Sequence, residues 1–286
     1  MRKLALLLSL TMLLAGGEVV FAGGPTLRIA SFNNQADLSA DHHHWAGRAR
    51  RVRQLLEDRR WDVVGMQEPF SFQVKDMEEM LPDYAWVGNS TDGKIEDGYW
   101  HYNPIFYRKD RIRLLDWGSF WFSETPDVPA SKSWDAHTSR FCVWAKFRDR
   151  RSGRIFFEFN CHFDHKGEEA RQHSARIVLD KIASLVGSHP FFINGDFNTV
   201  QGSPAYNILA DSGKVIDSYY CASDKENTLI ASWNDWKMER EVKYPSNFDH
   251  IFISPGTKAL SWKLLTVQYD GAYPSDHFPI EVEWQL

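Results

Sequence analysis

Strand-like and helix-like segments alternate along this chain of 286 residues, without an internal repeat, a Pro-rich linker or a low-complexity stretch. Short runs rich in β-branched and aromatic residues predict strands, and longer runs with apolar residues three and four positions apart predict helices. Helices that flank two sets of strands favour two packed mixed sheets with the helices outside. No break in composition requires a second domain, so we expect residues 23–286 to form one domain.

The boundaries of these segments follow from turn residues. Strands are predicted at Thr26–Phe32, Val63–Met66, Pro104–Tyr107, Val143–Phe147, Arg154–Cys161, Pro190–Asn194, Phe248–Ile253, Leu264–Tyr269 and Ile280–Trp284. Helices are predicted at Trp45–Arg59, Phe72–Met80 and Glu168–Leu185. The two strands on either side of residues 149–153 are expected to form a hairpin.

Two long connections, residues 89–102 and 120–141, are rich in Trp, Tyr, Ser, Asp and Gly. Loops of this length inside a compact domain are commonly functional. Their aromatic rings are candidates for contact with a sugar, a base or a lipid. The alternative is that Trp100, Trp121 and Trp134 cap the edges of the sheets.

The first 22 residues have the pattern of a secretory signal. Arg2 and Lys3 precede an apolar run from Leu4 to Leu14, and the segment ends at Ala22 in the small-x-small pattern of a cleavage site. The run is too short to span a bilayer comfortably, which disfavours an uncleaved anchor. We therefore expect cleavage near Ala22 and a secreted or periplasmic protein without a membrane span.

The charge balance bears on the class of ligand. The formal net charge is −5, whereas a protein that binds duplex DNA usually carries a basic stripe that neutralises phosphates. The only dense basic run is Arg48, Arg50, Arg51 and Arg53, which is predicted to lie on the solvent face of a helix. This balance counts against tight, sequence-independent DNA binding, although a nuclease remains an alternative.

Three cysteines cannot form a full disulfide framework. Cys142 and Cys161 fall in strand-like runs, where a small buried thiol is expected, and Cys221 is the third. One bridge among them is the alternative.

The stretch FFINGDFNTV, residues 191–200, places an acid and an amide two positions apart where a buried strand emerges. Side chains alternate along a strand, so Asp196 and Asn198 are expected to point to one side. The alternative is an Asx turn that ends the strand, because Asp and Asn bond their own backbone well.

Polar side chains recur wherever a predicted strand ends or begins. They are Asn33, Glu68, His162, Asp196, Asn198, Asp249, Asp276 and His277. One such residue would be a strand terminus, but so many predict a single polar site at one end of a sheet. Oxygen ligands from Glu68, Asp276 and Asn33 suit a hard cation, Mg²⁺ first, with Mn²⁺ or Ca²⁺ as alternatives.

Two of these residues carry imidazoles, His162 and His277, which titrate near neutrality as acid–base chemistry requires. A metal that contacts a phosphoryl oxygen, a base for water and an acid for the leaving oxygen together make a phosphoester hydrolase. The residues thus favour a hydrolase of phosphoric esters.

Seven strings then identify a family. In order, they are TLRIASFNN, GMQEP, NPIFYRKD, FNCHFDHKGEEAR, NGDFNT, NFDHIFIS and SDHFPI. Their order resembles that of the endonuclease/exonuclease/phosphatase superfamily, which includes pancreatic-type deoxyribonuclease, abasic-site endonucleases, bacterial sphingomyelinases, deadenylases and inositol-phosphate phosphatases. The resemblance implies an α+β fold, a four-layer αββα sandwich, and a Mg²⁺-dependent phosphoesterase.

The resemblance also implies roles for individual residues. Asn33 matches the first amide, Glu68 the principal metal carboxylate and Asp276 an acid near the metal. Asp196 and Asn198 match the pair that positions the water and the phosphate. The remaining matches are His277 as base, Asp249 as the acid that orients it, and His162 as general acid.

Three further residues have alternative interpretations. His165 and Arg171 are candidates for phosphate contact, or else plain surface residues. Relatives often carry an acid at the position of His101, where it supports the histidine that matches His162. Two adjacent imidazoles repel when both are charged, which lowers at least one pKa.

The superfamily does not fix the substrate, because fold and site chemistry are shared while loops differ. We predict an exported phosphodiesterase or phosphatase, active as a monomer on a small phosphorylated substrate of the sugar or glycan type. The alternatives are a secreted nuclease, a sphingomyelinase-like phospholipase and a catalytically inactive binding module. The phospholipase needs an exposed apolar hairpin, and no strand pair in the sequence has that pattern.

Overall fold

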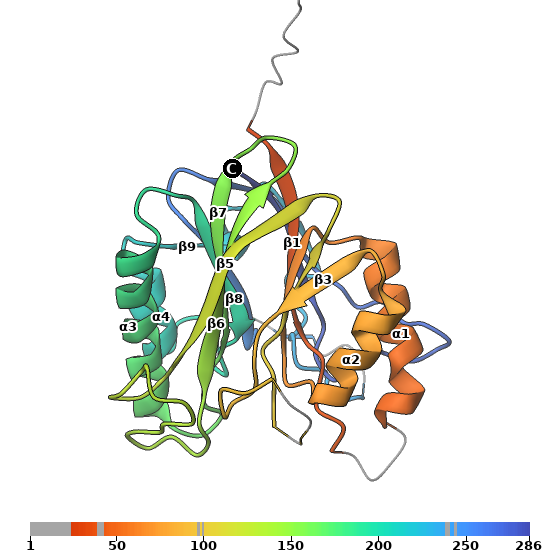
Figure 1. The fold of residues 1–286 in the computed structure, drawn as a ribbon, viewed down its shortest axis with the longest axis horizontal. Helices are drawn as coiled ribbons and strands as arrows, with labels where there is room; N and C mark the ends of the chain where they lie inside the picture. The colour runs from red at the N-terminus through yellow and green to blue at the C-terminus, as the bar shows by residue number, and fades with distance from the viewer. Residues whose placement is uncertain (1–23, 39–42, 96–97, 99, 238–240, 243–244) are drawn as a thin grey trace, which may run out of the picture.

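The computed structural model describes residues 24–38, 43–95, 98, 100–237, 241–242 and 245–286. The predicted signal segment, residues 1–22, lies outside them. Two mixed β-sheets pack face to face, and helices cover the outer face of each (Figure 1). This arrangement confirms the four-layer αββα sandwich.

The first sheet has seven strands in the order β10-β12-β13-β1-β2-β4-β3. The second has six, in the order β5-β6-β7-β8-β11-β9. The strands of the first sheet are β1 Thr26–Asn33, β2 Val63–Gln67, β3 Tyr84–Val87, β4 Ile105–Arg108, β10 Asp224–Glu226, β12 Lys258–Leu264 and β13 Ile280–Gln285. Those of the second are β5 Ile112–Trp121, β6 Phe141–Asp149, β7 Ile155–His162, β8 Phe191–Asp196, β9 Ile216–Asp217 and β11 Asp249–Ile253.

Each sheet contains one parallel pair at its centre. In the first sheet β1 runs parallel to β2, and in the second β7 runs parallel to β8. Parallel neighbours end at the same edge of a sheet, and β1 also contacts β8 across the sandwich. The carboxyl ends of all four strands therefore meet in one region.

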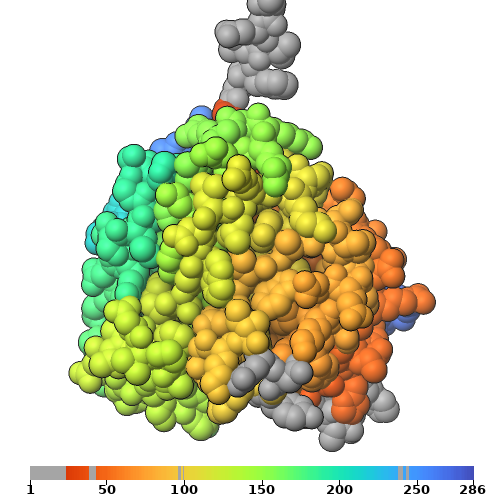
Figure 2. All heavy atoms as spheres, viewed as in Figure 1, coloured from red at the N-terminus to blue at the C-terminus, as the bar shows by residue number. Residues whose placement is uncertain are grey.

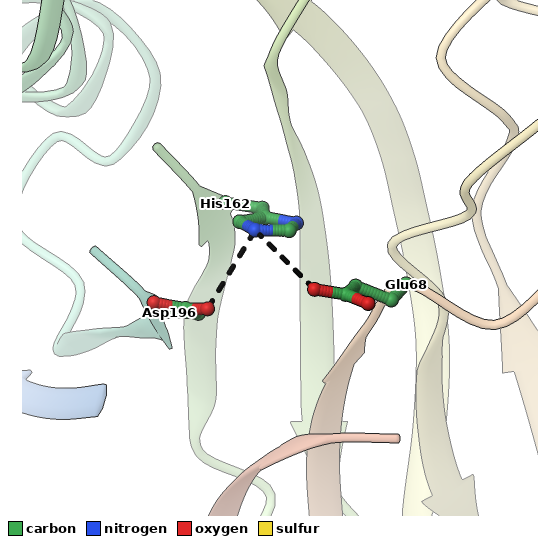
Figure 3. Close-up of side chains that lie close together, drawn as sticks. All are labelled: Glu68, His162 and Asp196. Atoms are coloured by element: carbon green, nitrogen blue, oxygen red, sulfur yellow. Dashed lines mark ion pairs between the residues drawn. The ribbon is translucent and has the colours of Figure 1, made fainter. Parts of the chain in front are cut away.

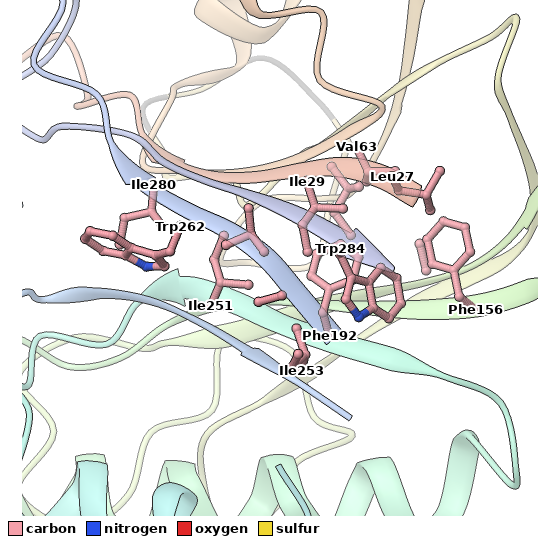
Figure 4. Close-up of a cluster of buried hydrophobic side chains, with 14 of the residues drawn as sticks. Leu27, Ile29, Val63, Phe156, Phe192, Ile251, Ile253, Trp262, Ile280 and Trp284 are labelled. Carbon is pink, nitrogen blue, oxygen red and sulfur yellow. The ribbon is translucent and has the colours of Figure 1, made fainter. Parts of the chain in front are cut away.

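The centre of the molecule is an apolar layer between the two sheets (Figure 4). Leu27, Ile29 and Val63 of the first sheet meet Phe192 and Ile251 of the second, and all five are fully buried. Alternation places these side chains on the inner faces. Burial of a side chain of this size contributes about 1.5–3 kcal/mol to folding.

Apart from the short α5 (Ser218–Cys221), whose Tyr219 packs in the layer between the sheets, the helices bury their apolar faces on the outer faces of the sheets. The helices are α1 Trp45–Arg59, α2 Ser71–Met80, α3 Glu168–Leu185, α4 Pro204–Ala210 and α5 Ser218–Cys221. Val52 and Leu55 of α1 pack with Phe32 and Val64 of the first sheet, and α3 packs likewise on the second. The predicted ranges of α1 and α3 are confirmed, because both have a clear apolar face with a period of 3.6 residues.

A buried polar layer interrupts the apolar centre on the way to the carboxyl ends of the strands. Asn160 donates to the carbonyl of Met66 at 2.7 Å and accepts from Gln67 at 2.7 Å. Within the described part of the chain, neither carboxyl oxygen of the fully buried Glu158 has a hydrogen-bond partner. Burial therefore raises the pKa of Glu158 well above its usual value.

A glycine fixes how closely β7 and β8 approach. Gly195 has φ +151°, and a Cβ atom at this position would lie 1.9 Å from the carbonyl oxygen of Cys161. The next residues on the two strands, His162 and Asp196, are paired in register. The backbones can be this close only because residue 195 has no side chain.

One predicted strand is wrong. The sequence predicts a strand at Leu264–Tyr269, but the strand there, β12, is Lys258–Leu264 and pairs with β13. The polar residues Lys258, Ser261 and Lys263 and a register shift between Ala259 and Ser261 hide its alternation. The short strands β3, β9 and β10 and the long edge strand β5 also escaped prediction.

Arg48 also differs from expectation. It is predicted on the solvent face of a helix but is fully buried, with 0% of its surface exposed. Its guanidinium donates to the carbonyls of Asn34 at 2.7 Å, Gln35 at 2.9 Å, His43 at 2.8 Å and Pro274 at 3.1 Å. Burial lowers its pKa to about 10, and the nearby charge of Asp276 favours its cationic form.

The aromatic loops are packed more tightly than a free binding surface would be. Trp121 is buried, donates to the carbonyl of Thr91 at 2.7 Å and stacks on Phe141. Trp134 stacks on His173 with ring centroids 4.1 Å apart. Figure 2 shows the two loop regions side by side at the lower edge of this face. Trp100 is 56% exposed.

The three cysteines are all free in the structure, and Cys142 and Cys161 are buried as predicted. Among the described residues, no helix combines the length and the apolar character that a bilayer crossing requires.

Candidate functional site

The polar residues that follow the strands come together at one end of the sandwich. Asn33 ends β1, Glu68 follows β2, His162 ends β7 and Asp196 ends β8. His277, in the segment before β13, lies beside Asp196, with His277 Nε2 3.9 Å from Asp196 Oδ2. The gathering expected from the sequence is present, while the role of each residue stays a prediction.

His162 lies between the two carboxylates (Figure 3). Its Nε2 is 3.6 Å from Asp196 Oδ2 and 3.9 Å from Glu68 Oε1. Asn33 joins the same two acids, because its Nδ2 donates to Glu68 Oε1 and to Asp196 Oδ2, both at 3.0 Å. Its Oδ1 accepts from the backbone N–H of Gln35 at 2.9 Å and therefore faces away from the acids.

Glu68 is held in an uncommon backbone conformation, with φ +78°. Positive φ in a residue other than glycine is uncommon and often marks a functional position. Burial disfavours the charged carboxylate, but the imidazole of His101 and the hydrogen bond from Asn33 outweigh it, so the pKa of Glu68 lies below its usual value. The side chain keeps 21% of its surface exposed.

Asp196 and Asn198 form an Asx turn and also belong to the site. The backbone N–H of Asn198 donates to Asp196 Oδ1 at 2.9 Å, and Asn198 has φ +48°. This leaves Asp196 Oδ2 for Asn33, so the turn and the site are compatible. Burial, together with the charge of Asp249, raises the pKa of Asp196 to about 7.

Asn198 itself does not extend from β8 by simple alternation, because it lies two residues beyond the strand end. Its Nδ2 donates to the carbonyl of Phe163 at 3.1 Å, which ties the turn to the segment after β7.

Asp249 and His277 form a close pair. His277 Nδ1 lies 2.8 Å from Asp249 Oδ2, and both side chains are buried. Burial disfavours the imidazolium, but the charge of Asp249 and this hydrogen bond outweigh it, so the pKa of His277 lies well above its usual value. The pair has the geometry that fixes the orientation of an imidazole.

Asp276 lies beside the cluster, linked to it through a residue that sequence reasoning missed. Gln35 Nε2 donates to Asp276 Oδ2 at 3.1 Å, and Ser275 Oγ donates to Asp276 Oδ1 at 3.2 Å. Gln35 follows β1 with φ +54°. The polar run Asn33-Asn34-Gln35 was the available signal, but nothing in it indicates which amide reaches Asp276.

Arg140 is the second residue missed from the sequence. Its Nη1 lies 2.8 Å and 2.9 Å from the two ring nitrogens of His162, and its Nη2 lies 3.2 Å from His165 Nδ1. Burial, together with the charge of Arg140, lowers the pKa of His162 well below its usual value. Arg140 ends a long loop, where no periodicity indicates the direction of a side chain.

Three predicted or noted residues have other surroundings. Arg171 donates to the carbonyl of Asp164 at 2.9 Å and pairs with Glu168 at 2.6 Å, so it fixes the start of α3. His165 is exposed and reaches the site only through Arg140. His101 packs against Phe70, and burial together with the charge of Arg140 lowers its pKa.

The donor set suits a divalent cation. Ligand atoms of Glu68, His162 and Asp196 all lie within 4.8 Å of one another, and those of Asp196, Asp249 and His277 form a second such group. Carboxylate oxygens are the preferred ligands of Mg²⁺, Mn²⁺ and Ca²⁺. A buried acid with a raised pKa, as Asp196 is, gains stability from a neighbouring positive charge.

The protonation pattern is opposite to the one that the predicted roles require. A general acid must start protonated and a base unprotonated, yet His162 favours the neutral form and His277 the charged form. Neutralisation of Asp196 lowers the pKa of His277, since Asp196 is one of the charges that raise it. A cation held by Glu68 and Asp196 would therefore bring His277 closer to the form that a base needs.

Comparison with known proteins gives a consistent result. The sequence profile described as the Endonuclease/Exonuclease/phosphatase family matches residues 26–277. Among solved structures, the mannosyl-6-phosphatase of Bacteroides thetaiotaomicron is 35% identical, with a TM-score of 0.85 over 90% of this chain and 99% of that chain.

The matches at lower sequence identity or coverage support fewer conclusions. TDP2 of D. rerio, solved with a single-stranded DNA product, has a TM-score of 0.67 at 22% identity over 91% of this chain and 98% of that chain, which shows a shared fold alone. An uncharacterized protein of Acanthamoeba polyphaga mimivirus is 30% identical over 169 residues, 55% of this chain. The match spans 60% of the length of that viral relative.

Proposed function

Because the chain belongs to the endonuclease/exonuclease/phosphatase family, we propose that it is a divalent-metal-dependent phosphatase that acts on a small phosphorylated sugar or glycan. Hydrolysis of phosphoric esters is the activity of the family. The finer assignment to a monoester of a sugar rests on the surroundings of Arg140, and it agrees with the mannosyl-6-phosphatase at 35% identity.

The two carboxylates Glu68 and Asp196 are the proposed metal ligands, with Mg²⁺ as the first candidate. A divalent cation there would polarise a phosphoryl oxygen and stabilise the charge that develops during hydrolysis. Asn33 holds both acids in place through its amide nitrogen.

The remaining residues of the cluster are proposed to bind phosphate and to move protons. His277, oriented by Asp249, is the proposed base for the attacking water. Asp196 lies 3.9 Å from His277 Nε2, close enough to position that water. Asn198 is the proposed donor to the phosphoryl group, and His162 is the proposed group that hydrogen-bonds the leaving oxygen.

Arg140 is the observation that favours a monoester. Its guanidinium is a cation beside His162, where the leaving oxygen is proposed to lie. A phosphate monoester carries close to two negative charges at neutral pH and a diester only one, so a fixed arginine stabilises the monoester more. His165 Nδ1 accepts from Arg140 Nη2, which leaves its Nε2–H as a further proposed donor.

The net charge of −5 supports a small substrate over a nucleic acid, since polyanion binding usually requires a basic groove. Export to the periplasm or the exterior is part of the same proposal and rests on the first 22 residues. A phosphorylated sugar or glycan outside the cytoplasm is a substrate that such a protein could reach.

A substrate panel tests the proposal. Mannose 6-phosphate, glucose 6-phosphate, nitrophenyl phosphate, bis-nitrophenyl phosphate, sphingomyelin and plasmid DNA are each assayed with Mg²⁺ and with EDTA. We expect metal-dependent turnover of the sugar phosphates with a kcat/KM at least tenfold above that for the diesters. Preferred cleavage of DNA or sphingomyelin would show that the proposed substrate class is wrong. Turnover that is unchanged by EDTA would overturn the metal assignment.

The variant Arg140→Gln tests the preference for a monoester over a diester. We expect kcat/KM for nitrophenyl phosphate to fall by about 10- to 100-fold, as for the loss of one charge-assisted contact in a site, with a smaller loss for the bis ester. Equal losses on both substrates would remove the argument for a monoester.

A further inference from the structure

A polar cavity of about 300 Å³ opens at the end of the sandwich opposite the candidate site. Five arginines line it: Arg28, Arg60, Arg108, Arg111 and Arg151. Only two carboxylates, those of Asp62 and Glu283, lie in the same wall. A chain with a net charge of −5 thus gathers five cations around one hollow.

The cavity is distinct from the catalytic end. Arg28 lies near the start of β1 and Asn33 ends that strand, so they are five residues apart. A strand rises about 3.3 Å per residue, which separates them by about 17 Å. In Figure 1, β1 begins at the top of the molecule and runs downward. No residue of the candidate site lines the cavity.

Two of the arginines are fixed in place by acids. Arg111 Nε lies 2.7 Å from Asp149 Oδ1, and its side chain is only 7% exposed. Arg108 pairs with Asp110 at 2.5 Å and with Asp62 at 3.3 Å. These contacts hold the guanidinium groups against their mutual repulsion.

Of the remaining three arginines, Arg60 lies 3.8 Å from Asp83 Oδ2, whereas the side chains of Arg28 and Arg151 have no acid partner in the described part of the chain. Arg28 Nη1 donates to the carbonyl of Arg59 at 2.6 Å, which is a neutral partner. Arg151, exposed in the turn between β6 and β7, forms no ion pair within the part of the chain that the structure describes. Burying or crowding cations without a counter-charge is unfavourable, so an anion in the cavity would stabilise the arrangement.

We propose that this cavity binds a small oxyanion, a phosphate or sulfate group either free or carried on a sugar, through Arg28, Arg151 and Arg111. The planar guanidinium group matches the geometry of such oxyanions and donates two parallel hydrogen bonds. A volume of about 300 Å³ is at the lower end of the range for ligand pockets, which fits a single charged group or one monosaccharide and not a polymer. The site does not depend on the proposed phosphatase activity.

Isothermal titration of the full chain with sodium sulfate tests this inference, at constant ionic strength set by chloride. Arg151→Glu changes an exposed turn residue and leaves the fold intact, and Arg28→Gln removes a second contact. We expect each to weaken sulfate binding at least tenfold. Arg113→Glu is the matched control, because Arg113 is exposed on β5, undergoes the same change of charge and does not line the cavity.

The variant Arg140→Gln distinguishes sulfate binding in the cavity from sulfate binding at the catalytic end. Retained sulfate binding in Arg140→Gln and its loss in Arg151→Glu support the second site, as does an unchanged kcat/KM of Arg151→Glu on nitrophenyl phosphate. The reverse pattern, or no binding beyond that of chloride, overturns the proposal. Titration with glucose 6-sulfate distinguishes the two sources: affinity tenfold above that of free sulfate assigns the site to a sugar-borne group, and equal affinity assigns it to the free oxyanion.

Discussion

His277 Nδ1 lies 2.8 Å from Asp249 Oδ2, although Asp249 begins β11 of the six-stranded sheet and His277 precedes β13 of the seven-stranded sheet. This hydrogen bond, like the one from Asn33 to Asp196, thus joins the two sheets at the candidate site. It also couples the protonation of His277 to the packing of the sheets, because both side chains are buried.

Replacement of Asp249 by Asn tests this coupling. Asp249 raises the pKa of His277, so the variant should titrate His277 at lower pH, which histidine NMR signals in metal-free protein can report. We expect kcat/KM to fall by about 10²- to 10⁴-fold, the range for loss of assisted proton transfer. An unchanged titration of His277 would show that the hydrogen bond does not control its charge.

The same variant has a defined effect on stability. A histidine whose pKa is raised by folding stabilises the native state below its usual pKa, and this contribution is lost as pH rises through the folded value. The difference in unfolding free energy between wild type and Asp249→Asn should therefore be larger at pH 6 than at a pH above the folded pKa of His277. Urea titrations at several pH values, with chelator present, provide the measurement.

Glu68→Gln keeps the size of the side chain and removes its charge. We expect Mg²⁺ affinity to fall at least tenfold, about 1.4 kcal/mol, with a matching loss of activity. Titration calorimetry of the metal measures the first, and the control Glu57→Gln alters an exposed acid of α1 that pairs with Arg53. Normal Mg²⁺ affinity in Glu68→Gln would remove this residue from the metal site.

Glu158→Gln should stabilise the protein at neutral and alkaline pH. The pKa of Glu158 is raised by burial, so the native state binds more protons than the unfolded chain, and stability falls as pH rises above the usual carboxyl value. The neutral amide does not have to take up this proton, so its advantage over Glu158 should grow as pH rises above the usual carboxyl pKa. Thermal unfolding at pH 4 and pH 8 compares the two proteins: a gain at pH 8 that is absent at pH 4 is the expected result.

Arg48→Met should destabilise the fold by about 3 kcal/mol or more, because several buried carbonyls lose their donor at once. It should also lower activity, since two of these carbonyls belong to Asn34 and Gln35 beside the site. Arg50→Met is the matched control on the same helix. Its side chain is 74% exposed, so a change within about 0.5 kcal/mol is expected. Equal losses in the two variants would contradict the structural role of Arg48.

The sequence predicted the elements whose pattern is set by local burial. The apolar face of α1 and the runs at Val63 and Phe191 have one dominant environment, so periodicity alone locates them. The strand β12 carries polar residues on an inner position and a register shift, and its alternation is lost. Pairing with β13 determines the strand there, and a short window of sequence carries no information on that pairing.

The residues of the candidate site also fall into a predictable group and a group that the sequence pattern does not locate. Glu68, His162 and Asp196 follow directly from strands, and the topology of parallel neighbours brings them together. Gln35 and Arg140 lie in irregular segments, and only tertiary contacts determine where their side chains point. Arg48 shows the limit most clearly, because a cation next to three other arginines is buried and donates to loop carbonyls, one of them that of Pro274, 226 residues away.

The contact between Gly195 and the carbonyl of Cys161 restricts which genetic changes the protein can accept. Even a methyl group at residue 195 would force β7 and β8 apart one position before His162 and Asp196, and so would widen the gap between those two side chains. Saturation of this codon should yield glycine alone among working clones. A residue that offers no functional group to any ligand is thus as unreplaceable as the acids it lies beside.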